Sequence, residues 1–355
     1  MMRLNLNAPF NTSSYGYVSS FLFEELTKLG YDIYLQPIST VAPEPRFAPR
    51  IVATKGKKFH YDAPTLKIWH QFDLKEFVGR GPKVAFPIFE LAQFNDEERH
   101  SLEFPDHLIV CSEWARQVVL RETNRSEESV HVVPLGIDPD IFYPEEQSSG
   151  KTIFLNCGKW EYRKGHDILA QAFSKAFKPG DNVELWMMPH NSFISPLRAK
   201  EWENAYLRSL MGDHIKIFPR LHTQQDVCNV MRQATCGVFP SRAEGWNLEL
   251  LEMMALGKEV IATNCTAHAE FCTRENTHFI AMDETETAFD GVFFDGRGQW
   301  HRFGQSQMDR LISSMLVVAG FGTSVNLAGI QTGKEYTWAN SAAKLDKVLC
   351  NIMSQ

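Results

Sequence analysis

The sequence predicts an α/β protein with two domains, each a parallel sheet flanked by helices, that face each other across a cleft. Three observations predict this class. The 355 residues are more than one domain of ordinary size needs and enough for two. Short apolar runs alternate with amphipathic stretches almost throughout, as buried parallel strands and covering helices require. The stretch 136–151, rich in Pro, Gly, Ser and acidic residues, interrupts this alternation and indicates a connection between domains.

Each half of the chain contains its own series of strand candidates. In the first half, amphipathic stretches at Val18–Leu29 and Glu113–Glu122 predict helices, and Gly30 follows the first of them where a helix C-terminus favours positive φ. The strands expected in the first half are Leu4–Ala8, Asp32–Pro37, Leu66–His70, Val84–Pro87, His107–Cys111 and Val130–Pro134. Those expected in the second are Thr152–Cys157, Val183–Met188, Ile215–Phe218, Cys236–Pro240 and Glu259–Ala262.

Composition excludes several classes of protein. No apolar run is long enough for a helix that spans a bilayer, and the first residues lack the apolar core of a secretory signal. Seven scattered cysteines without a CxxC pair indicate neither a disulfide framework nor a structural zinc site, so we expect a reducing, cytoplasmic protein.

Charge argues against a general nucleic-acid binder, because the net charge is −7. Residues 46–67 depart from this average. Six of their side chains are basic and only Asp62 is acidic, which is typical of a solvated loop and equally permits contact with an anionic acceptor or an acidic membrane surface. The basic residues are Arg46, Arg50, Lys55, Lys57, Lys58 and Lys67.

The strongest functional motif is FPSRAEGWNLELLEMMALGKEVIAT, residues 239–263. A strand ends at Pro240, a loop carries Glu244 and Gly245, and a helix follows with Glu252 further along it. Carboxylates accept hydrogen bonds from vicinal hydroxyls, so the two acids would suit the sugar and the ribose of one extended ligand. The helix N-terminus between them would suit a diphosphate. In isolation, this spacing is more typical of exposed positions on an amphipathic helix.

A second motif is FLNCGKWEYRKGHDILAQAF, residues 154–173. A strand is followed by Gly158, Lys159, Lys164 and Gly165, and then by a helix. A departing nucleoside diphosphate gains negative charge as the glycosidic bond breaks, and a nearby cation stabilises that charge. The alternative is a pair of surface lysines at the start of a helix.

Together these motifs resemble those of retaining glycosyltransferases of family 4, which have the GT-B fold of two Rossmann-like domains. The resemblance implies that Glu244 contacts the donor sugar and Glu252 the ribose, with Gly245, Trp246, Asn247 and Leu248 also lining the donor site. Trp246 and Asn247 stand where the family usually has Phe and Gly. It also implies that Lys159 and Lys164, with Gly158, hold the diphosphate. Lys159 replaces the usual Arg and lacks its planar fork.

Further segments agree with this family. Residues 131–144 resemble its interdomain strand and linker, so Asp138 and Asp140 are not expected to bind a metal. Residues 262–271 resemble a segment whose final acid, Glu270, lies near the donor. Residues 335–349 resemble the closing helix, with Trp338, that crosses back to the first domain. The implied domains are 1–145, which binds the acceptor and carries the closing helix of about 336–355, and 150–335, which binds the donor.

The first domain conforms less closely to the family. Its opening loop, NTSSYGYVS, has one glycine, Gly16, and makes Ser14, Tyr15 and Gly16 candidates for contact with substrate. Many family members carry a His at the end of the fifth strand. The equivalent stretch here, VAFPIFELAQF, has no His but contains Glu90, as an acceptor contact or a structural anchor. His70 is a candidate general base. A buried or loop histidine with a structural role is equally compatible with its position.

The function implied is transfer of a hexose, with retention of configuration, from a nucleoside diphosphate sugar to a hydroxyl of a glycan or polysaccharide precursor. No metal or other cofactor is expected. A hydroxylated nucleobase in DNA remains an alternative acceptor. A nucleotide-sugar epimerase or hydrolase of the same fold, and a non-catalytic sugar-nucleotide binding protein, are alternative functions. Peripheral membrane contact and the oligomeric state stay open.

Overall fold

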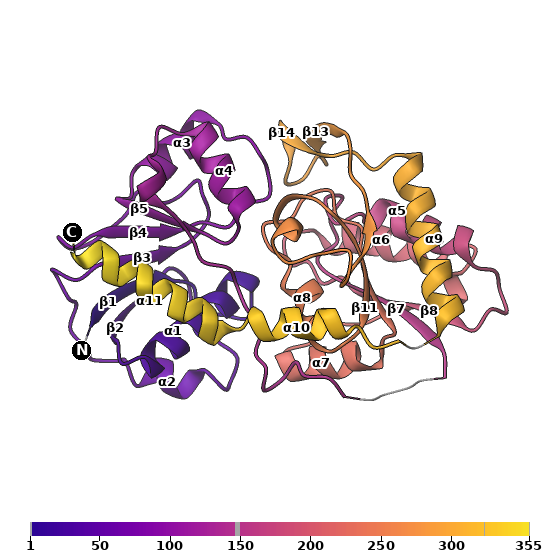
Figure 1. The fold of residues 1–355 in the computed structure, drawn as a ribbon, viewed down its shortest axis with the longest axis horizontal. Helices are drawn as coiled ribbons and strands as arrows, with labels where there is room; N and C mark the ends of the chain where they lie inside the picture. Colours follow the sequence, from indigo (N-terminus) through magenta and orange to yellow (C-terminus); the bar gives the residue numbers. More distant parts are fainter. Residues whose placement is uncertain (1, 146–149, 323, 355) are drawn as a thin grey trace. The chain divides into compact units, whose positions relative to one another are not determined.

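The computed structural model describes residues 2–145, 150–322 and 324–354 (Figure 1). The chain divides into two compact units, Met1–Gly136 with Tyr336–Gln355, and Ile137–Glu335. Residues 146–149 of the expected connection lie outside the described residues. The chain enters the second unit earlier than residue 145 because Ile141 and Phe142 are buried there. The carbonyl of Ile141 accepts hydrogen bonds from Cys228 Sγ (3.2 Å) and an Arg232 guanidinium N–H (3.1 Å) of the same unit.

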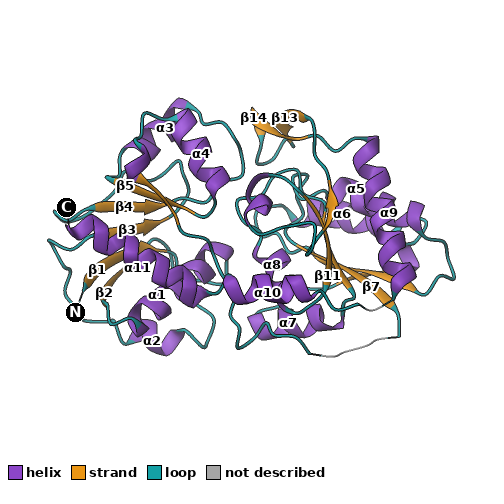
Figure 2. Ribbon diagram, viewed as in Figure 1, coloured by secondary structure: helices purple, strands orange, loops and turns teal. Residues whose placement is uncertain are grey.

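The first unit is a parallel six-stranded sheet with strand order β2-β1-β3-β4-β5-β6, flanked by helices (Figure 2). Leu4, Leu6 and Ala8 of β1 are fully buried. The strands are β1 Arg3–Ala8, β2 Asp32–Pro37, β3 Thr65–Ile68, β4 Lys83–Phe86, β5 His107–Val110 and β6 Val130–Val132. The helices are α1 Ser14–Lys28, α2 Ala48–Val52, α3 Asp96–Glu103, α4 Glu113–Glu122 and α11 Trp338–Ser354, with the 3₁₀ turn η1 at Glu127–Ser129.

The closing helix α11 packs against α1 (Figure 1). Its first residue, Trp338, stacks on Phe21 of α1 with ring centroids 4.9 Å apart and planes 8° apart. The hydroxyl of Tyr31 donates to the carboxylate of Asp346 at 2.7 Å. The final helix therefore belongs to the first unit through apolar stacking reinforced by a hydrogen bond.

The second unit contains another parallel six-stranded sheet, of order β12-β11-β10-β7-β8-β9, and a separate antiparallel hairpin of β13 and β14. The strands are β7 Thr152–Cys157, β8 Val183–Met188, β9 Ile215–Ile217, β10 Cys236–Phe239, β11 Glu259–Thr263, β12 His278–Ile280, β13 Thr285–Phe289 and β14 Asp295–His301. The helices are α5 His166–Ala176, α6 Pro196–Leu207, α7 Gln224–Gln233, α8 Leu248–Ala255, α9 Gln305–Phe321 and α10 Leu327–Glu335, with 3₁₀ turns η2 Gly212–His214 and η3 Thr266–Glu270.

Strand order determines where ligand-binding loops meet. The direction of winding reverses at β1 in the first sheet and at β7 in the second. At such a switch point the loops that follow two adjacent strands separate and leave room for a ligand at the carboxyl edge of the sheet. In the second unit these are the loops after β7 and β10, which pair in parallel through Phe154 and Leu155. The loops of the two predicted motifs, after β7 and after β10, therefore lie at the same carboxyl edge of the second sheet.

Every strand expected from the sequence coincides with an observed strand to within two residues at each end. Strands β12, β13 and β14 were not expected. Helix α1 begins at Ser14, before the predicted Val18, because the Ser13 side chain accepts a hydrogen bond from the backbone N–H of Gly16 and caps the helix. Within the described ranges, no helix combines the length and apolar character needed to cross a membrane.

Candidate active site

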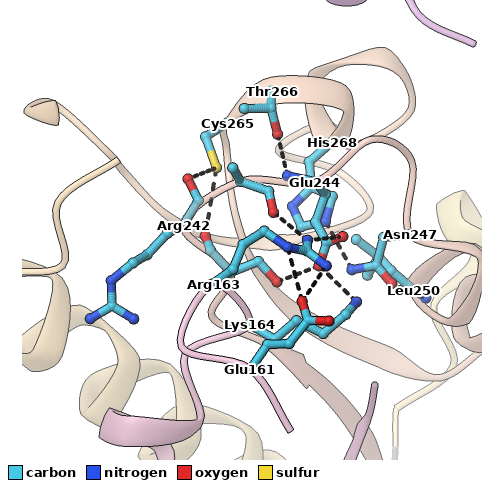
Figure 3. Close-up of polar contacts among 12 residues, drawn as sticks. Glu161, Arg163, Lys164, Arg242, Glu244, Asn247, Leu250, Cys265, Thr266 and His268 are labelled. Carbon is cyan, nitrogen blue, oxygen red and sulfur yellow. Dashed lines mark hydrogen bonds and ion pairs between the residues drawn. The ribbon is translucent and has the colours of Figure 1, made fainter. Parts of the chain in front are cut away.

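Glu244 is the centre of a buried polar cluster between β10 and α8 (Figure 3). Its Oε1 accepts hydrogen bonds from Lys164 Nζ at 2.9 Å and from Ser241 Oγ at 2.7 Å. Its Oε2 accepts from an Arg163 guanidinium N–H at 2.7 Å. Its backbone N–H donates to Thr266 Oγ1 at 2.8 Å. The side chain is thus fixed by two cations and a hydroxyl from two different loops.

Arg163 was not among the residues selected from the sequence. Its guanidinium lies between Glu161 and Glu244 in Figure 3 and donates to Glu161 Oε2 from two nitrogens, at 3.1 and 2.8 Å. It also donates to the carbonyl of Ala243 at 2.7 Å. The available signal was a third basic residue directly before Lys164, but the sequence does not show which way such a residue points.

Charges in this cluster are mutually stabilised. Burial alone would raise the pKa of Glu244, but the positive charges of Arg163 and Lys164 outweigh burial and hold this pKa well below its ordinary value. Burial alone would lower the pKa of Lys164, and the charges of Glu244 and Glu249 raise it above its ordinary value. Glu244 is therefore ionised and Lys164 protonated at neutral pH.

Two glycines allow the loop after β7 to approach its neighbours. Gly158 has φ of +146°, and a Cβ there would lie 2.6 Å from Cδ of Lys164, so the lysine stem crosses this residue closely. Gly165 has φ of +75°, and a Cβ there would lie 2.3 Å from the carbonyl oxygen of Pro240. Side chains at either position would push Lys164 or the β10 loop out of place.

Lys159 is directed toward a different neighbour. Its ammonium lies 4.9 Å from the centroid of the Phe193 ring, a cation–π arrangement. The side chain is half-buried. Lys159 and Lys164 thus belong to one loop, but only Lys164 contacts Glu244.

Asn247 explains a departure from the family pattern. It is the N-cap of α8 with φ of 85°, in the left-handed region where Gly is favoured and Asn is the next most tolerated residue. Its Oδ1 accepts from the N–H of Leu250 at 3.2 Å, and its Nδ2 lies 2.9 Å from His268 Nε2. Because His268 Nδ1 lies 2.8 Å from the carbonyl of Thr263, Nδ1 carries the proton and Nε2 accepts.

The residues beside Asn247 are largely buried. Gly245 is buried, and Trp246 packs against Phe271 with ring centroids 5.0 Å apart. Leu248, half-buried, is the first residue of α8. Glu270 is half-buried and is the last residue of η3. The same turn is bonded to the Glu244 backbone: Thr266 Oγ1 accepts from the Glu244 N–H, and the Ala267 N–H donates to the Glu244 carbonyl.

Glu252 lies in α8 in a different electrostatic situation from Glu244. It is 5% exposed, and within the residues that the structure describes its carboxylate has no hydrogen-bond or ion-pair partner. Burial, and then the charge of Glu249, raise its pKa well above the ordinary value. Cys157 at the end of β7 is affected by the charges of Glu249, Glu252 and Lys164, so these groups share one region. A buried acceptor without a donor is suited to ligand hydroxyls.

The first unit brings its own candidates together at the end of β1, β3 and β4. The Tyr15 hydroxyl donates to the Ile88 carbonyl at 2.9 Å. The rings of Tyr15 and His70 are 4.6 Å apart, and His70 stacks on Phe72. Burial, and then the charge of Glu90, raise the pKa of Tyr15 well above its ordinary value. Ser14, Tyr15 and Gly16 form the first turn of α1, with Ser14 exposed.

Asp138 and Asp140 form a local turn, in which the Asp138 carboxylate accepts from the backbone N–H of Asp140 at 3.0 Å. Over the described part of the chain, no group of three or more His, Cys, Asp or Glu side chains is arranged to hold a metal ion.

Comparison with known sequences identifies a family model that matches part of the second unit, and relatives that match part of the chain. Residues 151–291 match the family model described as "Glycosyl transferases group 1". The chain is 26% identical over 176 residues to the D-inositol 3-phosphate glycosyltransferase of Mycolicibacterium smegmatis, a match that covers 46% of this chain and 39% of that protein. It is 26% identical over 227 residues to the MMP alpha-(1->4)-mannosyltransferase of Mycolicibacterium hassiacum, covering 61% and 52%. The chain thus matches about half the length of these relatives or less.

Solved structures match over the whole chain. Sucrose-phosphate synthase from Thermosynechococcus elongatus has a TM-score of 0.72 at 14% identity, with all of both chains covered. HepE from Anabaena, in complex with UDP and glucose, has a TM-score of 0.68 at 14% identity and covers 99% of this chain and all of its own. The predicted fold class is confirmed, and the predicted enzyme class is confirmed at the level of homologues, which are named glycosyltransferases. The chain has the GT-B fold, and residues 151–291 match the group 1 glycosyltransferases, whose activities are of the EC 2.4 type.

Proposed function

We propose that this chain is a retaining, family 4 glycosyltransferase that moves a hexose from a nucleoside diphosphate sugar to a hydroxyl of a glycan or polysaccharide precursor. The observation that carries the proposal is the pairing of two unlike buried carboxylates around α8. Glu244 is held by two cations, whereas Glu252 has no partner within the described residues.

The proposed donor position follows from these properties. Glu252, buried without a donor, accepts hydrogen bonds from the ribose hydroxyls. The diphosphate lies at the N-terminus of α8, where the positive end of the helix dipole favours an anion. Glu244 addresses the sugar. Its two oxygens offer about four acceptor sites, and Lys164, Ser241 and Arg163 use three. One site therefore remains for a sugar hydroxyl.

Lys164 is proposed to stabilise the leaving diphosphate, with Lys159 as a more distant contributor. Glu244 is a weak nucleophile because two cations compensate its charge. This favours front-face transfer, in which the leaving phosphate takes the acceptor proton, over a covalent glycosyl-enzyme. We propose that no metal takes part, since lysine supplies the cation that the leaving group needs. Nucleotide sugars would be met in the cytoplasm.

The acceptor is proposed to contact the Tyr15, His70 and Glu90 group of the first unit. The basic segment 46–67 does not favour a DNA acceptor, because four of its six basic side chains already have carboxylate partners. These pairs are Arg46–Glu44, Arg50–Glu24, Lys57–Asp32 and Lys67–Asp73.

The direct test is incubation of the protein with a panel of UDP-, GDP- and ADP-hexoses, with and without an oligosaccharide acceptor mixture. We expect one donor to be consumed in an acceptor-dependent way and the product to keep the anomeric configuration of the donor, by NMR. Consumption with no acceptor would instead support a hydrolase or epimerase. Binding of a donor without turnover of any kind would support a non-catalytic protein.

A further inference from the structure

The polar cluster around Glu244 contains two cations, Arg163 and Lys164, and they differ in how firmly they are held. Lys164 makes one ion pair, with Glu244 at 2.9 Å. Arg163 uses at least four of its five N–H donors, two on Glu161, one on Ala243 and one on Glu244. Glu161 and Arg163 are both buried. The guanidinium is therefore held by more hydrogen bonds than the Lys164 ammonium, whose partner among the described residues is Glu244.

Donor binding would change which anions Lys164 compensates, and would leave Arg163 as the main cation beside Glu244. In the proposed function Lys164 serves the diphosphate, and its ammonium cannot then compensate Glu244 to the same extent. Glu244 would remain in a buried position, where an uncompensated carboxylate is strongly disfavoured. A second cation that stays in place would keep it ionised and correctly oriented.

We propose that Arg163, anchored by Glu161, is a positioning residue that acts as the permanent counter-ion of Glu244 and thereby leaves Lys164 available to the donor's diphosphate. This inference rests on the proposed function for the role of Lys164, whereas the part concerning Arg163 and Glu244 does not.

The groups that face Glu244 come from three elements. Arg163 and Lys164 come from the loop after β7, Ser241 from its own loop, and Cys265 and His268 from the segment around η3. Burial lowers the pKa of His268 and raises that of the Cys265 thiol, so both are neutral at pH 7. Arg163 and Lys164 are therefore the cations that control the protonation of Glu244.

The test follows the Glu244 carboxyl carbon by ¹³C NMR in protein labelled at glutamate, with the resonance assigned by its loss in Glu244→Gln. In the wild type we expect no titration between pH 5 and 8, with or without inorganic pyrophosphate. In Arg163→Met we expect a titration of Glu244 to appear within this range, and its midpoint to rise further when pyrophosphate recruits Lys164. If Glu244 of ligand-free Arg163→Met still showed no titration between pH 5 and 8, the proposal would be overturned.

Arg242→Met is the matched control. Arg242 belongs to the same loop as Glu244 and is also buried in an ion pair, but its guanidinium donates to Asp167 at 2.8 Å from two nitrogens. It should leave the Glu244 midpoint where it is in the wild type. If this variant raised the midpoint equally, the effect would be a general loosening of the loop and the proposal would fail.

A further variant, Arg163→Lys, keeps the test informative if Arg163→Met does not fold. It retains the charge but not the fork, so we expect a smaller rise of the Glu244 midpoint, seen as a titration between pH 5 and 8 when pyrophosphate is bound. No titration of Glu244 in this range would contradict the proposal. If pyrophosphate fails to bind the wild type, the diphosphate site of the proposed function fails, and the ligand-free midpoints still decide the role of Arg163.

Discussion

Lys164 and Lys159 lie five residues apart in one loop, yet they have different partners. Lys164 contacts a buried carboxylate and crosses Gly158, while Lys159 lies over the ring of Phe193. The family resemblance assigns both to the diphosphate, but only Lys164 is positioned by the polar cluster. At the scale of single residues, the contacts therefore distinguish two lysines to which the sequence motif assigns the same role. Lys164 contacts the carboxylate cluster, and Lys159 does not.

Lys164→Ala is expected to lower kcat for glycosyl transfer by about 10²–10³-fold, because in the proposed function it removes the cation that stabilises the charge on the leaving group. Lys159→Ala serves as its control and should lower kcat by less than about tenfold. Steady-state rates with saturating donor measure both. Equal losses in the two variants would show that the distinction drawn from their contacts is wrong.

Glu252→Gln is expected to stabilise the protein while it weakens donor binding. The folded-state pKa of Glu252 is raised, so the folded protein binds this proton more tightly than the unfolded chain and loses stability as pH rises above about 4.5. The amide removes that cost, and we expect a gain of about 1–3 kcal/mol in the free energy of unfolding at pH 8. The gain should shrink toward pH 4.5.

Urea unfolding at pH 8 and pH 4.5 measures this gain, and titration with the donor measures the loss of affinity. Glu249→Gln is the control, since Glu249 is half-buried in the same helix. If Glu252→Gln were less stable than the wild type at pH 8, the Glu252 carboxylate would not be destabilising in the ligand-free protein, and the prediction would be wrong.

At the scale of elements, helix α8 depends on an unusual N-cap residue. Asn247 combines a left-handed backbone with a side-chain cap and a contact to His268. Glycine, usual at this position in the family, meets only the first requirement. Asparagine adds the hydrogen bonds that fix the start of the helix against η3.

Asn247→Ala is expected to lower the free energy of unfolding by about 2 kcal/mol, from loss of the cap and the penalty of a left-handed alanine. Asn247→Gly should cost less, because glycine accepts the backbone conformation. Chemical denaturation of the two variants gives the comparison. If Asn247→Ala and Asn247→Gly lowered the free energy of unfolding equally, the left-handed backbone conformation would not contribute to the cost.

The elements were predictable where apolar pattern alone determines them. Runs such as Thr152–Cys157 and Val183–Met188 are apolar because both faces of a parallel strand are buried, and the observed bounds are the same. The β13–β14 hairpin was not predictable, because its residues are mostly exposed and polar. It is held by tertiary contacts, among them the ion pair of Arg242 with Glu286 at 3.4 Å and the hydrogen bond from the His301 N–H to the Arg242 carbonyl.

In the site, too, some features follow from the sequence pattern and others depend on tertiary contacts. Glu244, Glu252 and Lys164 could be selected as candidates because they lie in motifs that follow buried strands. The role of Arg163 and the different directions of Lys159 and Lys164 depend on side-chain packing, which spacing along the chain does not encode.

At the scale of the whole molecule, each unit has one sheet whose winding reverses at its first strand, and each has its candidate residues at that reversal. Histidines whose pKa is lowered by burial are a second shared feature. Burial, and then the charge of Lys164, lower the pKa of His166 to about 3. Burial, followed by His107, lowers the pKa of His131 in the first unit.

These histidines predict acid sensitivity. Their folded-state pKa values lie below the unfolded value of about 6.5, so the stability they permit is complete above that pH and is lost as pH falls toward the folded values. Each contributes up to about 1.4 kcal/mol per pH unit. His166→Phe should remove its share of the decline in unfolding free energy between pH 7 and 5, measured by urea denaturation. A decline as steep as in the wild type would contradict this assignment.

In the proposed function, the second unit binds a nucleoside diphosphate sugar around α8. Crystals soaked with a panel of nucleotide sugars test it most directly. We expect one ordered donor with its ribose at Glu252, its diphosphate at Lys164 and the helix N-terminus, and its sugar at Glu244. A donor ordered away from these three side chains would contradict it.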